Sequence, residues 1–152
     1  MIWLMKSEPD VYSIDNLAKD KKTWWEGVRN YQARNFMTQQ MQVGDTVLFY
    51  HSNAEPPGIA GIAQVSHSAV PDDSQYNKKS EYFEPRASKE KPVWQCVQVE
   101  FVEKFDELIP LEVLKKQKNL ESMLVLKKGQ RLSIQPVTEQ EFKVILKMAA
   151  KK

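Results

Sequence analysis

The feature that most restricts the fold is the run VWQCVQVEFVEKF, residues 93 to 105. Val97, Val99 and Phe101 alternate with polar residues, which is the period of a β-strand that turns one face to a core. Short helical segments of uneven length separate this strand from four others, unlike the regular alternation of a doubly wound sheet. The pattern favours a small, partly open barrel surrounded by helices, although an open sheet would satisfy it too. The predicted strands are residues 1–6, 45–51, 59–66, 93–104 and 130–136.

Capping residues mark the ends of the predicted helices. Ser13 can cap a helix over SIDNLAKD, and Thr138 begins a capping-box pattern before a terminal helix. The segment YQARNFMTQQM, residues 31–41, places its apolar side chains on one helical face. Two further helices are expected, one that Pro110 opens and one from Asn119 to Gly129. The polar residues 67–91 are expected to form a long ordered excursion.

The chain has 152 residues, the size of one domain, and a net charge of +2 from 22 basic and 20 acidic residues. Any contact with nucleic acid therefore needs a local cluster of positive charge. The lone Cys96 excludes an internal disulfide and a multi-cysteine metal site. No apolar run is long enough to span a bilayer. We expect no metal, no cofactor and no membrane, and a cytoplasmic location, or a nuclear one in a eukaryote; the oligomeric state stays open.

The stretch WWEGVRNYQARNF, from Trp24 to Phe36, holds Arg29 and Arg34, two of only four arginines in the chain. A planar guanidinium suits stacked or bidentate recognition better than a lysine does. Together with aromatic rings and the amides of Asn30 and Asn35, these groups match the needs of a base site. The structural alternative is that the tryptophan at position 25 fills the core and that Arg34 pairs with a nearby glutamate.

Four runs in this chain resemble the EVE domain family: WLMKSEP (3–9), WEGVRNYQARNFM (25–37), GDTVLFYHS (44–52) and RLSIQPV (131–137). They follow the family's order over nearly the whole chain, so residues 1–152 are interpreted as a single EVE domain. The resemblance implies an α+β fold of the PUA-like type, a pseudo-barrel of mixed strands surrounded by short helices. It also implies recognition of a modified base in a pocket at the mouth of the barrel. The leading hypothesis is a non-enzymatic reader of modified cytosine or adenine in DNA or RNA, because the sequence has no metal triad, P-loop or Gly-rich dinucleotide motif.

The predicted site has two parts. In the base pocket, Trp25 is the leading candidate for the stacking ring, and Tyr50 would wall the pocket if the third run borders it. His51 or Ser52 could then donate a hydrogen bond to the ligand, although a histidine at a strand end is more often just hydrogen-bonded and solvated. The full base-pocket set is Ser7, Trp25, Val28, Asn30, Asn35, Tyr50, His51 and Ser52, and the phosphate or backbone set is Lys6, Arg29, Arg34 and Arg131.

Two further members of these sets have structural alternatives. The alternative for Ser7, and for its neighbour Glu8, is that the side chain only satisfies turn amides and binds nothing. Arg131 is either a phosphate clamp or a buried partner for a carboxylate, and the sequence does not separate the two.

The second functional hypothesis is an enzyme. The related ASCH group includes amidohydrolases of acylated pyrimidine nucleosides, which use a lysine beside a hydroxyl nucleophile and a glutamate. Lys6, Ser7 and Glu8 supply those residue types, and burial can keep a lysine neutral enough to activate a hydroxyl. Adjacent residues on a strand point in opposite directions, which argues against this hypothesis.

Overall fold

The computed structural model describes residues 1–129 and 131–150. The strands are β1 (Ile2–Ser7), β2 (Lys22–Trp24), β3 (Thr46–His51), β4 (Gly58–Pro71), β5 (Gln95–Pro110) and β6 (Ile134–Val137). The helices are α1 (Ile14–Asp20), α2 (Tyr31–Asn35), α3 (Leu111–Lys115) and α4 (Glu139–Ala150). Shorter turns are the π-helical η1 (Phe36–Gln40) and the 3₁₀ turns η2 (Asp73–Tyr76), η3 (Lys118–Leu120) and η4 (Leu124–Leu126).

One mixed sheet contains all six strands of the described residues, in the order β2-β5-β4-β3-β1-β6. The pair β1–β3 is parallel and every other pair is antiparallel. The sheet is not closed, because β2 and β6 are its edges. The predicted α+β class is confirmed. The five predicted strands are present as β1, β3, β4, β5 and β6, but β4 and β5 are longer than predicted, and β6 begins only at Ile134. Residue 130, the first of the last predicted strand, lies outside the described residues.

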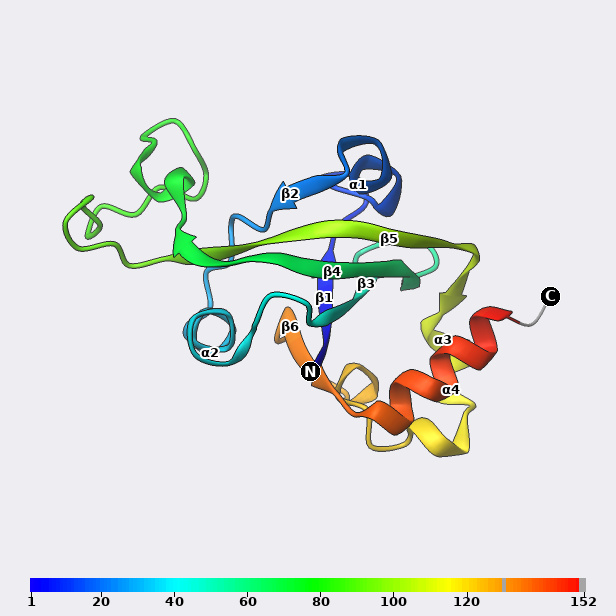
Figure 1. Ribbon diagram of the computed structural model, residues 1–152. Helices are drawn as coiled ribbons and strands as arrows, with labels where there is room; N and C mark the ends of the chain where they lie inside the picture. The colour runs from blue at the N-terminus through cyan, green and yellow to red at the C-terminus, as the bar shows by residue number, and fades with distance from the viewer. Residues whose placement is uncertain (130, 151–152) are drawn as a thin grey trace.

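The two longest strands, β4 and β5, run side by side through the centre of the molecule (Figure 1). A Cβ added at Gly58 would lie 2.1 Å from the carbonyl oxygen of Ile109, and one at Gly61 would lie 2.3 Å from that of Glu103. Only glycine allows the two backbones to approach so closely. Helices α3 and α4 lie near one end of this pair, and the segment 72–94 extends from the other end (Figure 1).

The apolar side chains form two core clusters, and alternate residues of β1 belong to different clusters. Trp3 and Met5 lie in the first cluster, together with Trp25 and Met37, whereas Leu4 lies in the second, which α3 and α4 help to form. This follows from the two-residue period of a strand that is buried on both faces. Both faces of the sheet centre are therefore covered, and the ends of the strands remain for a binding site.

The predicted helix caps are confirmed. The Ser13 hydroxyl accepts the amide of Asn16 at the start of α1. The Thr138 amide donates to Glu141 Oε1 (3.0 Å), and the Glu141 amide donates to the Thr138 hydroxyl (3.1 Å), so the capping box before α4 is complete.

The predicted helix from Asn119 to Gly129 is wrong. This segment contains the end of η3 and then η4, and the extended backbone of Met123 separates them (ψ 130°). Leu120, Met123 and Val125 are all buried, a spacing that no single helical face provides. Pro110 precedes α3 as its N-cap residue, and α3 has only five residues.

Across residues 1–129 and 131–150, no helix has the length and apolar character to cross a membrane.

Candidate functional site

The carboxyl ends of β1 and β3 and the start of β6 meet at one end of the sheet. Ser7 lies opposite His51 in the parallel pair, and β6 runs antiparallel to β1. The Lys6 amide donates to the Ser133 carbonyl (2.9 Å), and the Ser52 amide donates to the Ser7 carbonyl (3.0 Å). Polar side chains from three segments distant in sequence are thereby brought to one place.

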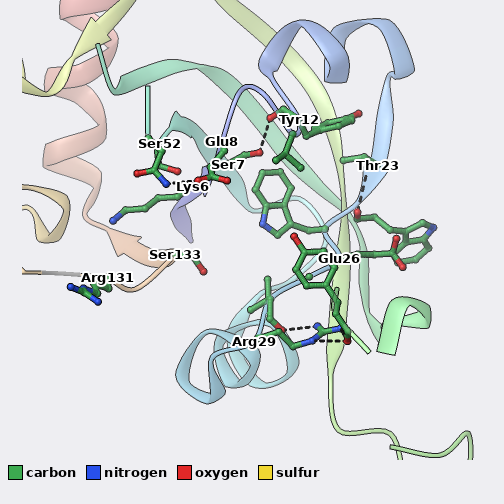
Figure 2. A pocket seen from close by; sticks show the side chains of 17 residues that line it. Lys6, Ser7, Glu8, Tyr12, Thr23, Glu26, Arg29, Ser52, Arg131 and Ser133 are labelled. Carbon is green, nitrogen blue, oxygen red and sulfur yellow. Dashed lines mark hydrogen bonds between the residues drawn. The ribbon is translucent and has the colours of Figure 1, made fainter. Parts of the chain in front are cut away.

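A cavity of about 840 Å³ lies at this end of the sheet (Figure 2). The turn after β1, strand β2 and the segment after it complete its wall, together with one residue of the segment 72–94. Figure 2 shows Lys6 and Arg131 on one side of the cavity and Thr23 and Glu26 on the other. The lining residues are Lys6, Ser7, Glu8, Val11, Tyr12, Thr23, Trp24, Trp25, Glu26, Gly27, Val28, Arg29, Ser52, Asn53, Tyr82, Arg131 and Ser133.

Seven of the twelve predicted site residues line this cavity, and their roles in binding remain predictions. They come from both predicted sets and from four separate segments of the chain. They are Lys6, Ser7, Trp25, Val28, Arg29, Ser52 and Arg131.

Trp25 belongs to the core and to the cavity wall at once. The residue is 8% exposed, and its ring packs edge-to-face on Phe49, with ring centroids 5.4 Å apart. Its amide donates to the Val97 carbonyl (2.8 Å), which fixes the start of the segment after β2. The ring is therefore held rigidly while it also lines the cavity.

Asn30, Asn35 and Arg34 do not line the cavity, and each has an intramolecular partner. Asn30 caps α2, because its Oδ1 accepts the amide of Ala33 (2.9 Å). Arg34 donates to the carbonyl of Val93 (2.9 Å) and to Asn35 Oδ1. These contacts order α2 and connect it to the chain just before β5, and Arg34 pairs with neither Glu8 nor Glu26 in the contacts described.

Tyr50 and His51 also lie outside the lining. Tyr50 is buried in the second core cluster, on the other face of the sheet, and burial raises the pKa of its phenol. His51 Nε2 accepts the amide of Ile14 (3.1 Å) at the start of α1. Burial lowers the pKa of His51, and the opposing effects of Asp15 and Lys104 are smaller. The neutral ring therefore acts as a cap for α1.

Arg29 is enclosed by the protein. Its guanidinium donates to the carbonyls of Val28 and Tyr82, to the carboxylate of Asp72 and to the hydroxyl of Ser74. Asp72 is fully buried and pairs with Arg29 at 3.1 Å. Burial alone would raise the pKa of Asp72, but hydrogen bonds, those from Ser74 first, outweigh it and lower that pKa. The pair is therefore charged at neutral pH.

The turn after β1 determines what Lys6, Ser7 and Glu8 can do. The Ser7 hydroxyl donates to the Tyr12 carbonyl (2.6 Å), and the Glu8 carboxylate accepts the amide group of Asn53. Burial lowers the pKa of Lys6. The hydroxyl proton of Ser7 is thus directed at a backbone carbonyl, which accepts a hydrogen bond but cannot act as a general base at neutral pH.

The sequence did not single out three large lining residues: Trp24, Glu26 and Tyr82. Trp24 is 38% exposed, and its ring contacts His67. Burial, and then the negative charge of Asp72, raise the pKa of Glu26. Tyr82 lies 56 residues after Glu26, in a polar segment, and no local pattern marks it.

Other groups in the described residues offer less chemistry. No three histidine, cysteine, aspartate or glutamate side chains there gather as metal ligands would. Cys96 is buried, and burial, the largest cause, raises the pKa of its thiol to about 12. A thiol with such a pKa is protonated at neutral pH and is a poor nucleophile, as expected of a small buried apolar residue.

Comparison with known proteins finds relatives that share the fold of this chain. Human thymocyte nuclear protein 1 (THYN1) is 40% identical over an alignment that covers 98% of this chain and 74% of that protein. The crystal structure of protein PSPTO5229 from Pseudomonas syringae superposes with a TM-score of 0.94 at 43% identity, covering 98% of this chain and 99% of that one.

Two further structures bear on function. Human THYN1 in complex with DNA containing 5-methylcytosine superposes with a TM-score of 0.90 at 39% identity, covering 99% of this chain and 98% of that one. A mutant ASCH protein from Zymomonas mobilis reaches a TM-score of 0.57 at 9% identity, covering 97% of each chain. At that identity the ASCH protein shares the fold alone.

A sequence profile of the EVE domain matches residues 1–148. The profile covers every strand of the sheet and all the residues that line the cavity. Profile, relatives and superposed structures agree, and the chain belongs to the EVE domain family.

Proposed function

We propose that this chain binds DNA carrying a modified base and holds that base in the cavity at the ends of β1 and β3. One observation carries the proposal: the cavity combines the ring of Trp25 with the cations of Lys6 and Arg131. The chain is also 39% identical to a human protein whose structure contains DNA with 5-methylcytosine. We therefore take 5-methylcytosine as the first candidate, and modified adenine and RNA as alternatives.

The geometry suits a base that has left the helical stack. Such a base needs a ring to stack on and polar groups directed at its edge. Trp25 and Trp24 offer rings, while Ser52, Ser133 and Thr23 bring hydroxyl groups that can donate or accept. A volume of about 840 Å³ lies in the upper part of the range for drug-sized ligands, so a base can enter together with its sugar.

A methyl group on the base would be read by van der Waals fit against the rings. One methylene more or less in an apolar pocket changes binding by about 1–3 kcal/mol, or roughly 10–200-fold. A preference of at least about tenfold for the methylated base is therefore expected. Contacts with the phosphates would supply most of the remaining affinity, and that part carries no information about the base.

The enzyme hypothesis has less support. Its nucleophile would be Ser7, whose proton is directed to the Tyr12 carbonyl. Its base would be Lys6, whose pKa burial lowers, so the lysine is the stronger part of the hypothesis. We therefore infer that the chain is a binding protein. If it comes from a eukaryote, we propose a nuclear location, because the human relative is named a nuclear protein.

The test is equilibrium binding to two DNA duplexes that differ only in the 5-methyl groups of their cytosines. We expect tighter binding to the methylated duplex, and a smaller effect for duplexes with N6-methyladenine and for RNA of the same sequence. Equal affinity for all of them would refute the proposal. Incubation with an acylated cytidine, followed by mass analysis, tests the alternative: release of the acyl group by wild type but not by Lys6→Ala would establish an enzyme.

Replacing Lys6 or Arg131 by glutamine should weaken binding to methylated and unmethylated duplexes equally. Each loss of a phosphate contact should lower the slope of log K against log salt concentration by about one. Titrations at several salt concentrations measure this slope. Lys147→Gln is the matched control, because Lys147 is an exposed lysine of α4, which does not line the cavity. A slope that is unchanged in both cavity variants would exclude the two residues from the phosphate contacts.

A further inference from the structure

We propose that Tyr82 provides a second aromatic wall of the base site and that Arg29 is a positioning residue that holds this ring, not a phosphate ligand. The identity of the ligand rests on the proposed function above. The position of the ring rests on contacts within the chain. Residues 72–94, which carry Tyr82, are called the arm below.

The guanidinium of Arg29 has no donor left for a phosphate. Nε donates to the Tyr82 carbonyl (3.3 Å), and Nη2 donates to the same carbonyl (2.8 Å) and to the Ser74 hydroxyl (3.1 Å). Nη1 donates to the Val28 carbonyl (2.9 Å) and to the carboxylate of Asp72 (3.1 Å). A guanidinium has five N–H groups, and these five bonds use all of them.

Two aromatic rings also flank Arg29. Its Cζ lies 5.3 Å from the ring centroid of Tyr82 and 5.3 Å from that of Trp94. Both distances are within the range of a cation–π interaction. A base therefore has little room to stack on this guanidinium, and the positive charge instead holds the ring of Tyr82.

The ring of Tyr82 rests on the backbone of Gly27. A Cβ added at Gly27 would lie 2.8 Å from Cζ of Tyr82, and Gly27 has a φ of +87°. The glycine is thus required twice, for its left-handed backbone and for the close approach of the ring. Gly27 and Arg29 contact the ring of Tyr82, and the hydrogen bonds from Arg29 to the Tyr82 carbonyl hold its backbone. The residue is nevertheless only half-buried and lines the cavity.

The arm is tied down at its base. The Asp72 amide donates to the Trp94 carbonyl (3.0 Å). The buried Gln75 side chain donates to that carbonyl (2.8 Å) and accepts the amides of Val93 (3.0 Å) and Trp94 (2.9 Å). These hydrogen bonds therefore fix the base of the arm and, with it, the position of Tyr82. A preformed ring costs little ordering entropy when a base binds.

The test compares Tyr82→Ala, Tyr82→Phe and Arg29→Lys with wild type on the methylated and unmethylated duplexes. Tyr82→Ala should weaken binding to the methylated duplex by roughly 5- to 150-fold, which corresponds to about 1–3 kcal/mol for one stacked base. Tyr82→Phe keeps the ring and should bind like wild type. Arg29→Lys keeps the charge but loses the planar fork, so it should reduce the preference for the methylated duplex.

Hydrogen exchange of the arm's amides, measured without DNA, is the second readout. Arg29→Lys should speed exchange at residues 80–84, because the two hydrogen bonds to the Tyr82 carbonyl are weakened. A phosphate ligand behaves differently: Arg29→Lys would keep the preference, and Arg29→Gln would lower the salt slope by about one. Either result would overturn the positioning role, as would wild-type exchange in Arg29→Lys.

The two proposals fail in different ways. If wild type prefers the methylated duplex and Tyr82→Ala binds that duplex as tightly as wild type does, the second wall is wrong and the proposed function stands. If wild type shows no preference, the proposed function fails and the wall has no base to stack on. In that case, hydrogen exchange in Arg29→Lys still tests whether Arg29 holds the arm in position.

Discussion

Replacing Asp72 by alanine is expected to lower the free energy of unfolding by about 3–5 kcal/mol, the usual cost of removing one partner from a buried ion pair. Asp72 is fully buried, and its loss leaves the Arg29 guanidinium without a counter-charge. The amides of Gly27 and Ser74 also lose their acceptor. Urea unfolding of the two proteins measures the difference.

The neighbouring residue offers a matched control. Asp73 is exposed, so Asp73→Ala should change the stability by no more than about 0.5 kcal/mol. Equal effects of the two substitutions would show that burial of the Asp72–Arg29 pair is not the cause.

The effect of Asp72→Ala should depend on pH in one direction. The pKa of Asp72 is lowered from its ordinary value of 3.8, because its hydrogen bonds outweigh the opposing effect of burial. A carboxyl whose pKa is lower in the folded state stabilises the protein above its unfolded pKa, and this contribution is lost as pH falls through the folded pKa. The difference in the free energy of unfolding between wild type and Asp72→Ala should therefore be largest near pH 7 and should decrease below about pH 4.

Trp25→Ala should remove the preference for the methylated duplex and also cost about 3–5 kcal/mol of stability. Trp25 is 8% exposed and its ring packs on Phe49, so removal of the ring leaves a cavity in the first core cluster. It is also the ring that we expect to stack on the base. Binding must be measured at a temperature at which the variant is folded, as circular dichroism can show.

Two substitutions separate the structural role of Trp25 from its binding role. Trp24→Ala removes the adjacent ring, which is 38% exposed and contacts His67, and should cost only about 1 kcal/mol of stability. Trp25→Phe keeps an aromatic ring and should retain part of the preference. A Trp25→Ala protein that folds and still distinguishes the two duplexes would contradict the proposed role.

The strand order could not be read from the sequence, although most strands could. Alternating or continuous apolar runs marked five strands, because burial of one or both faces leaves a local pattern. β2 has three residues, and it exists only because it pairs with β5. Residues 66–68 of β4 are polar, yet the strand continues through them to Pro71 because it pairs with the start of β5. Such pairing is long-range and leaves no local signal.

The candidate site was predicted in part for the same reason. Lys6, Ser7 and Ser52 lie at or just after strand ends, and the parallel pairing of β1 and β3 brings those ends together. Asn30 has a side chain that could read a base edge, but its Oδ1 accepts a hydrogen bond from the Ala33 amide at the start of α2. Tyr82 reaches the cavity only through the fold of the arm. Residue types predict what a site can bind, and long-range contacts decide which of those residues reach it.

The most direct test of the base-binding cavity is isotope-filtered NMR of the complex with DNA whose 5-methylcytosine carries a ¹³C-labelled methyl group. We predict nuclear Overhauser contacts from that methyl group to the ring protons of Trp25, and weaker contacts to Tyr82 or Val28. The same DNA with the label on a thymine methyl outside the site should show no contact with these rings. Contacts of the 5-methylcytosine methyl only to residues outside the cavity lining would contradict the proposal.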